Sequence, residues 1–84
     1  MGKKDKLLER LSLQPTDFTF AELITLLGYF GYYIVKAGKT GGSRVSFAND
    51  KRDYIRIHKP HPRNTLKPYQ VKNILFALEE RELI

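Results

Sequence analysis

Both histidines of the chain, His58 and His61, lie in one five-residue segment, HKPHP. Imidazole has an ordinary pKa of about 6.5, so it can accept a proton from a ribose 2′-hydroxyl or donate one to a leaving oxygen. A nearby arginine or lysine can stabilise the charge that develops on a phosphate under attack. The segment therefore offers the groups that RNA cleavage requires. The alternative is structural: one imidazole binds a backbone carbonyl and the other faces water.

A metal site at these histidines is not expected. Pro60 lies between them and excludes a helix, so they cannot form a helical pair of ligands. The chain has no cysteine, which excludes disulfides and cysteine-based zinc sites. The two histidines could bind a metal only together with carboxylates, which are few nearby, so we expect no metal and no cofactor.

The positive charge of the chain is concentrated around the same segment. The net charge is +6, but residues 36–72 carry six lysines and four arginines against two aspartates, which gives +8. Such a concentration is typical of proteins that bind nucleic acid, because neutralised phosphates release counterions. A basic surface that only keeps the protein in solution is the alternative. A membrane partner is disfavoured, because no basic amphipathic helix accompanies the charge.

Hydrophobic periodicity predicts helices at both ends of the chain and strands between them. The predicted elements are helices over residues 3–13 and 20–30, strands over 32–37, 43–48 and 53–58, and a last helix from Pro68. Thr19 and Glu22 have the spacing of a capping box at the start of the second helix. The N-terminus lacks the apolar segment of a signal peptide, so we expect a cytoplasmic protein.

This order predicts an α+β fold, in which a three-stranded antiparallel sheet carries helices on one face. The other face of the sheet would be open to solvent. Strand alternation places the following side chains on it: Lys36, Arg44, Ser46, Tyr54, Arg56 and His58. The open face would therefore be basic and partly aromatic, and Tyr54 would be available to stack on a base.

The segments LITLLGYFGYYIVKAGKTGGSRVSF and IRIHKPHPRNTLKPYQVKNIL resemble the HicA (YcfA-like) toxin family. Members of this family share a Leu-Gly turn after the first helix and a basic Gly-Ser loop before the second strand. Next come a strand that ends in Pro and His and a Leu-Lys-Pro segment that leads into the last helix. The resemblance implies an α-β-β-β-α fold similar to double-stranded RNA-binding domains. Residues 18–84 would form this toxin domain, and residues 1–17 an N-terminal helical extension.

The resemblance also implies a toxin that cleaves mRNA without a metal and is neutralised by a HicB-type antitoxin. In the family the catalytic histidine usually follows Gly-Ser, whereas this chain has Arg44 at that position. Arginine stays protonated, so Arg44 can bind phosphate but cannot serve as a base. His61 falls where the family often carries a second histidine. We therefore assign proton transfer to His61 and His58, with Arg44 as the third catalytic residue.

Contacts with the RNA backbone are assigned to seven further residues. These are Lys36, Lys39, Ser43, Arg56, Lys59, Arg63 and Lys67. Two alternatives from other classes stay open. A non-catalytic RNA-binding module of the same fold would bind RNA in a salt-dependent manner and cut nothing. An interaction protein whose basic face meets an acidic partner would bind RNA only loosely.

Overall fold

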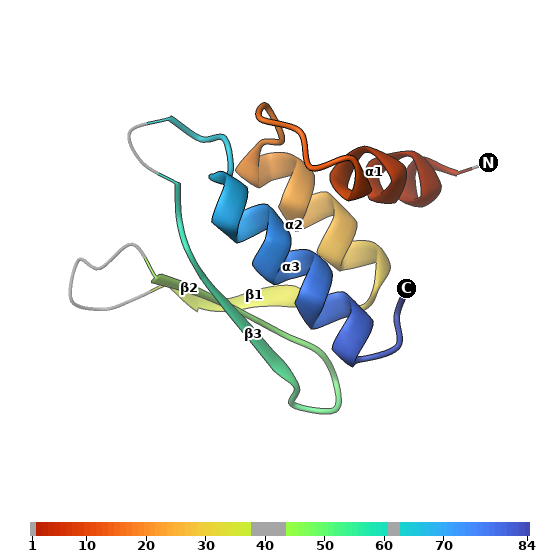
Figure 1. The fold of residues 1–84 in the computed structure, drawn as a ribbon. Coiled ribbons are helices and arrows are strands. Elements are labelled where there is room, and N and C mark those ends of the chain that lie inside the picture. Colours follow the sequence, from red (N-terminus) through yellow and green to blue (C-terminus); the bar gives the residue numbers. More distant parts are fainter. Residues whose placement is uncertain (1, 38–43, 61–62) are drawn as a thin grey trace.

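The computed structural model describes residues 2–37, 44–60 and 63–84, with the backbone alone described for Lys36 and Ala37. Its elements follow the predicted order (Figure 1). They are helices α1 (Lys3–Ser12) and α2 (Phe20–Tyr29), strands β1 (Tyr33–Ala37), β2 (Arg44–Ala48) and β3 (Tyr54–His58), and helix α3 (Pro68–Glu80). The prediction of an α+β fold with an additional N-terminal helix is confirmed.

Helix α2 begins and ends with hydrogen bonds that the local sequence encodes. Thr19 Oγ1 accepts a hydrogen bond from the N–H of Glu22 at 3.1 Å, and Glu22 Oε1 accepts one from the N–H of Thr19 at 2.9 Å. This pair is the predicted capping box. After the helix, Gly31 adopts a φ of +88°, and the N–H of Tyr32 donates to the carbonyl of Leu27 at 2.9 Å. This Schellman arrangement directs the chain into β1.

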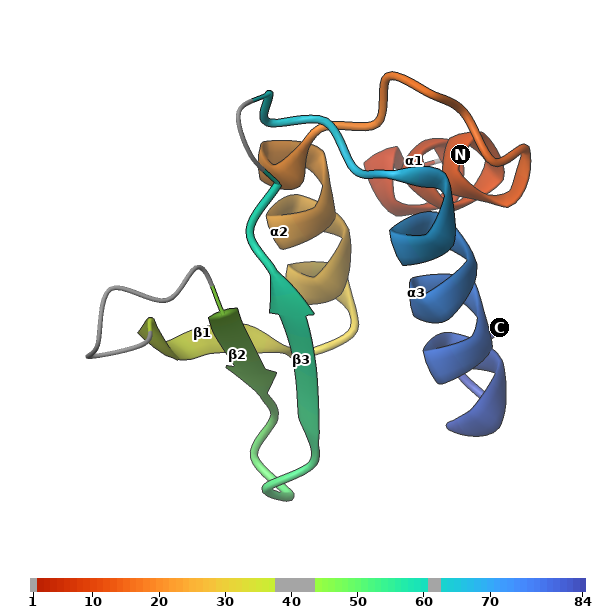
Figure 2. The same ribbon diagram turned by 60° about the vertical axis from the view of Figure 1, so that its left-hand side comes forward.

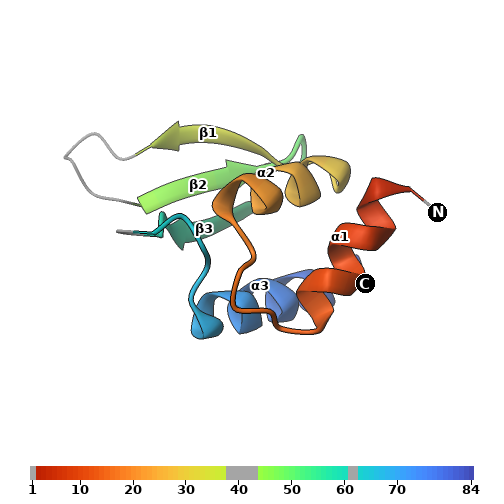
Figure 3. The ribbon, with the colours of Figure 1, turned by 90° about the horizontal axis from the view of Figure 1, so that it is seen from above.

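The sheet has the strand order β1-β2-β3, and both pairings are antiparallel (Figure 2). Alternate residues of β2 and β3 are buried, namely Val45, Phe47, Ile55 and Ile57. They join one hydrophobic core with side chains of α2 and α3, and both helices lie on the same face of the sheet (Figure 1). Strand β3 is the edge strand beside α3 (Figure 3). The predicted division into a core face and an open face is thus confirmed for β2 and β3.

Strand β1 departs from simple alternation. Its register with β2 shifts between Ile34 and Lys36, which is the irregularity that a β-bulge produces. Three consecutive side chains of this strand, Tyr33, Ile34 and Val35, are exposed, by 51%, 42% and 43%. The backbone of Lys36 lies opposite Ser46 of β2, but the predicted position of the Lys36 side chain on the open face is not tested.

Helix α1 contributes to the same core. Leu11 is fully buried in the cluster that α2 and α3 build. Arg10 ties the helix to the segment that follows it, because its Nη2 lies 3.0 Å from Asp17 Oδ1 and its Nη1 lies 3.5 Å from Glu22 Oε1. Helix α1 therefore packs across α2 and α3 on the side away from the sheet (Figure 3).

Three polar side chains join the start of β3 to the segment after α2 and to the end of α3. The carboxylate of Asp53 accepts hydrogen bonds from the Tyr32 hydroxyl and from the Arg81 guanidinium. The Arg81 bond first, and the Tyr32 bond second, hold the pKa of the Asp53 carboxyl below its usual range. Burial and then the Asp53 carboxylate raise the pKa of the Tyr32 hydroxyl. The hydroxyl therefore remains a donor at neutral pH.

Asp53→Asn should lower the free energy of unfolding at pH 7 by about 1 kcal/mol, because it weakens the hydrogen bonds from Tyr32 and Arg81 to a carboxylate that is partly exposed to solvent. The pKa of Asp53 is lower in the folded chain than in the unfolded chain. The stabilisation is therefore complete above about pH 5 and is lost as the pH falls through the folded pKa. Urea unfolding at pH 7, 5 and 3 should show the same difference between wild type and variant at pH 7 and 5, and a smaller difference at pH 3. The exposed Asp50→Asn is the control, and an equal difference at all three pH values would contradict the account.

Candidate functional site

Arg44 of β2 and His58 of β3 are direct neighbours on the open face. In the turn between these strands, the N–H of Asn49 donates to the carbonyl of Asp53 at 3.2 Å. Hydrogen-bonded and non-hydrogen-bonded pairs alternate along the strands from that point, so the Arg44–His58 pair is non-hydrogen-bonded. In such pairs the two Cβ atoms lie about 4.5–5.5 Å apart. Both residues are exposed, so the structure places a histidine and an arginine at adjacent positions on the solvent-exposed face.

Arg56 adds a second guanidinium to this face. It lies two residues before His58 on β3, so both side chains leave the strand on the same side. Its partner across the sheet is Ser46, which is half-buried. The guanidinium carbon of Arg56 lies 5.1 Å from the centroid of the Tyr54 ring, a cation–π contact that orients it along the strand. The stacking of Tyr54 on a base stays a prediction.

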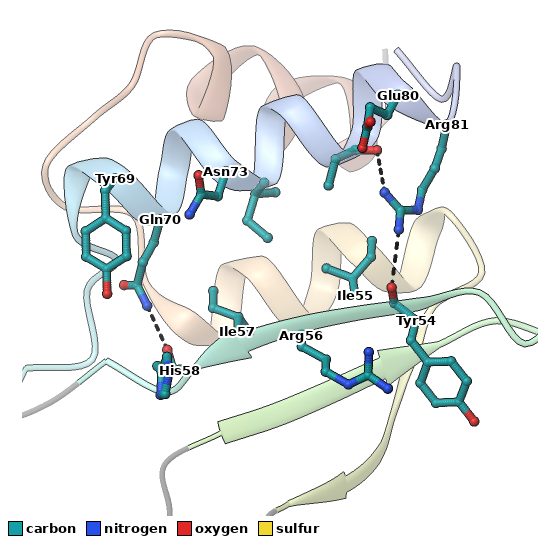
Figure 4. Close-up of a pocket in the computed structure, with 12 residues that line it drawn as sticks. Tyr54, Ile55, Arg56, Ile57, His58, Tyr69, Gln70, Asn73, Glu80 and Arg81 are labelled. Atoms are coloured by element: carbon teal, nitrogen blue, oxygen red, sulfur yellow. Dashed lines mark hydrogen bonds between the residues drawn. The ribbon is translucent and has the colours of Figure 1, made fainter.

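Gln70 fixes the backbone of His58. It is only 4% exposed, and within the described ranges it is the one buried polar residue. Its Nε2 donates to the carbonyl of His58 at 2.8 Å (Figure 4). Its Oε1 accepts from the N–H of Lys67 at 2.9 Å. The first turn of α3 is thereby tied to the end of β3. Sequence reasoning missed Gln70, although a glutamine three residues after an N-cap position is a known capping signal.

The structure therefore brings together three of the predicted site residues: Arg44, Arg56 and His58. Lys59, Arg63 and Lys67 are exposed on the segment between β3 and α3. Backbone hydrogen bonds join that segment to the chain at the start of α2: the N–H of Leu66 donates to the carbonyl of Phe18, and the N–H of Phe20 donates to the carbonyl of Asn64, each at 2.7 Å. The predictions for Lys39, Ser43 and His61 lie outside the described residues.

The protein is a small α+β domain with a basic open sheet face. Its α-β-β-β-α core carries helices on one face of the sheet and an exposed arginine–histidine pair on the other. A family model described as the HicA toxin of bacterial toxin-antitoxin matches residues 20–79, from the first residue of α2 into the last turn of α3. The chain belongs to the HicA toxin family and is a toxin of a toxin–antitoxin system.

Comparisons with curated proteins and with solved structures gave no match. The family match begins at the first residue of α2, so helix α1 lies outside it. In the part of the chain that the structure describes, no helix is long and apolar enough to cross a membrane.

Proposed function

We propose that the open face of the sheet binds RNA and that the protein is a metal-independent endoribonuclease acting on mRNA. The observation that carries the proposal is the Arg44–His58 pair, because it sets a proton-transfer group beside a permanent cation on a solvent-exposed face. Arg56, on the same face, supplies a further cation for the RNA backbone.

In the proposed reaction His58 takes the proton of a ribose 2′-hydroxyl as the 2′-oxygen attacks the adjacent phosphorus. The bond from phosphorus to the 5′-oxygen of the next nucleotide breaks, and that oxygen receives a proton from the second imidazole, His61. Arg44 stabilises the additional negative charge on the phosphorane. The products are a 2′,3′-cyclic phosphate and a free 5′-hydroxyl.

The test compares an RNA with its fully 2′-O-methylated counterpart, each incubated with the protein in EDTA. Wild type should cut the RNA into fragments that end in 2′,3′-cyclic phosphate and should leave the methylated strand intact. Cleavage of both strands, or products with 5′-phosphates, would contradict attack by the 2′-hydroxyl.

The partner that we propose is a HicB-type antitoxin, since membership of the HicA toxin family implies a cognate antitoxin. A second candidate function rests on a specific observation. Arg44 occupies the position at which the catalytic histidine usually follows Gly-Ser in the family, and this favours an RNA-binding module without cleavage. Bound but uncut RNA would identify that function.

Arg44→Ala should weaken binding of single-stranded RNA about tenfold. It should also reduce the slope of the logarithm of the binding constant against the logarithm of the salt concentration by about one. The reason is the loss of one phosphate contact on the open face, beside His58. Fluorescence anisotropy between 50 and 200 mM salt would measure both quantities. Lys72→Ala removes the same charge from an exposed position on α3, and equal effects of the two variants would show that only net charge matters.

A further inference from the structure

A groove of about 320 Å³ separates the edge of β3 from α3 (Figure 4). The apolar part of its lining comes from Ile55 and Ile57 of β3 and from Ile74 of α3. Its volume lies at the lower end of the range for small-molecule sites. The groove runs along the strand that carries Arg56 and His58, so it adjoins the open face.

The edge of β3 presents an unpaired donor and an unpaired acceptor to this groove. Because the pairs with β2 at Tyr54, Arg56 and His58 are non-hydrogen-bonded, the backbone groups of these residues point away from β2. The carbonyl of His58 accepts from Gln70 Nε2 at 2.8 Å, and that of Tyr54 accepts from Arg81 Nη2 at 3.2 Å. Between these two bridges, the N–H and C=O of Arg56 have no partner among the residues that the structure describes.

Helix α3 leaves room opposite Arg56. The two bridging side chains, Gln70 and Arg81, are long, whereas Asn73 and Ala77 between them are short, and all four line the groove. The amide of Asn73 points toward the groove in Figure 4 and makes no hydrogen bond within the described ranges. The part of the groove between the two bridges, called the slot below, is therefore closed at both ends by Gln70 and Arg81 and carries polar groups of Arg56 and Asn73 in the middle. A peptide strand along β3 would have to displace both bridges, whereas a single planar group would displace neither.

We propose that this slot holds one unpaired base of the RNA, an inference that rests on the function proposed above. Every base has a donor and an acceptor side by side on its pairing edge, which complements the N–H and C=O of Arg56. The apolar floor suits the faces of the ring, and the Asn73 amide can bind a further exocyclic group. With the base in the slot, its ribose and phosphate lie toward the open face that holds Arg44 and His58.

The location of the base can be tested by titrating ¹⁵N-labelled protein with each of the four nucleoside 5′-monophosphates. Ribose 5-phosphate serves as the control without a base. At least one nucleotide should shift the amide resonance of Arg56 and the side-chain amide of Asn73, whereas ribose 5-phosphate should leave both unchanged. Equal shifts with ribose 5-phosphate would overturn the proposal.

A second test blocks the slot with a larger side chain and measures RNA binding. Ala77→Met should lower the affinity for an eight-nucleotide RNA about tenfold, toward that of an abasic strand of the same length, because one base loses its contacts. Ala21→Met, at an exposed position on α2, is the matched control, and thermal melts would show that both variants fold. Unchanged RNA binding by Ala77→Met would overturn the base site. If that variant also lost binding of the antitoxin, the slot would belong to a protein segment.

The two proposals fail differently in this experiment. Binding of RNA and abasic strand with equal affinity by wild type overturns only the slot. Binding of neither strand overturns the RNA-binding function, and the slot proposal with it.

Discussion

His58→Ala should lower the rate of RNA cleavage at least about 100-fold, which is the typical contribution of a general acid or base. The affinity for RNA should change by less than about twofold, because the neighbouring cations Arg44 and Arg56 supply the phosphate contacts. The fold should be unaffected, since the His58 side chain is exposed and Gln70 binds only its backbone carbonyl.

Single-turnover cleavage with saturating protein would separate the chemical step from binding. Ser46→Ala, on the neighbouring strand of the same face, is the control and should cleave at close to the wild-type rate. His61→Ala would be measured in parallel, and a comparable loss is expected from its proposed role toward the leaving oxygen. A His58→Ala variant that cleaves as fast as wild type would remove His58 from the mechanism.

Leu11→Ala should lower the free energy of unfolding by about 3 kcal/mol, within the range for leucine-to-alanine changes in a core. Leu11 is fully buried against α2 and α3, so its truncation leaves a cavity that the surrounding side chains fill only in part. For a small domain with a total stability of about 5–15 kcal/mol, this loss is large. A loss of this size in Leu11→Ala would show that α1 stabilises the toxin domain, although the family match begins at α2.

Urea unfolding followed by circular dichroism would measure this effect. Leu13→Ala, only two residues further on but 78% exposed, is the matched control and should change stability by less than about 0.5 kcal/mol. If the two leucines proved equally tolerant of truncation, the packing of α1 described above would be wrong.

Much of the fold can be predicted from the sequence because its determinants are local. Alternation in β2 and β3 separates the buried Val45 and Ile57 from the exposed Arg44 and His58. The Thr19 capping box and the left-handed Gly31 mark the two ends of α2. Each of these signals depends on only a few neighbouring residues: the alternation repeats every second residue, and the cap after α2 depends on the backbone conformation of a single glycine.

The remaining features depend on contacts between distant residues. The bulge in β1 arises from pairing with β2 and has no signal of its own in the alternation. Gln70 binds a carbonyl twelve residues away, and Arg81 reaches Asp53 across 28 residues. Such contacts require the packed helix α3, so neither the anchoring of His58 nor the groove beside β3 could be predicted from periodicity.

Part of the candidate site could nevertheless be predicted from the sequence. Alternation placed Arg44, Arg56 and His58 on one face, as the structure has them. That Arg44 and His58 are direct partners depends in addition on the register of the turn between Asn49 and Asp53. A change of one residue in that turn would have separated them, because it would move every side chain of β3 to the other face.

The central claim is that the open face cuts RNA rather than only binding it. The most direct measurement is incubation of wild-type protein with a long single-stranded RNA in EDTA from pH 5.5 to 8, the range in which imidazole titrates, with binding recorded in the same samples. The account predicts RNA that is bound and cleaved within this range. RNA that is bound but stays intact at every pH would contradict it and would leave a binding module in which the Arg44–His58 pair holds phosphate without chemistry.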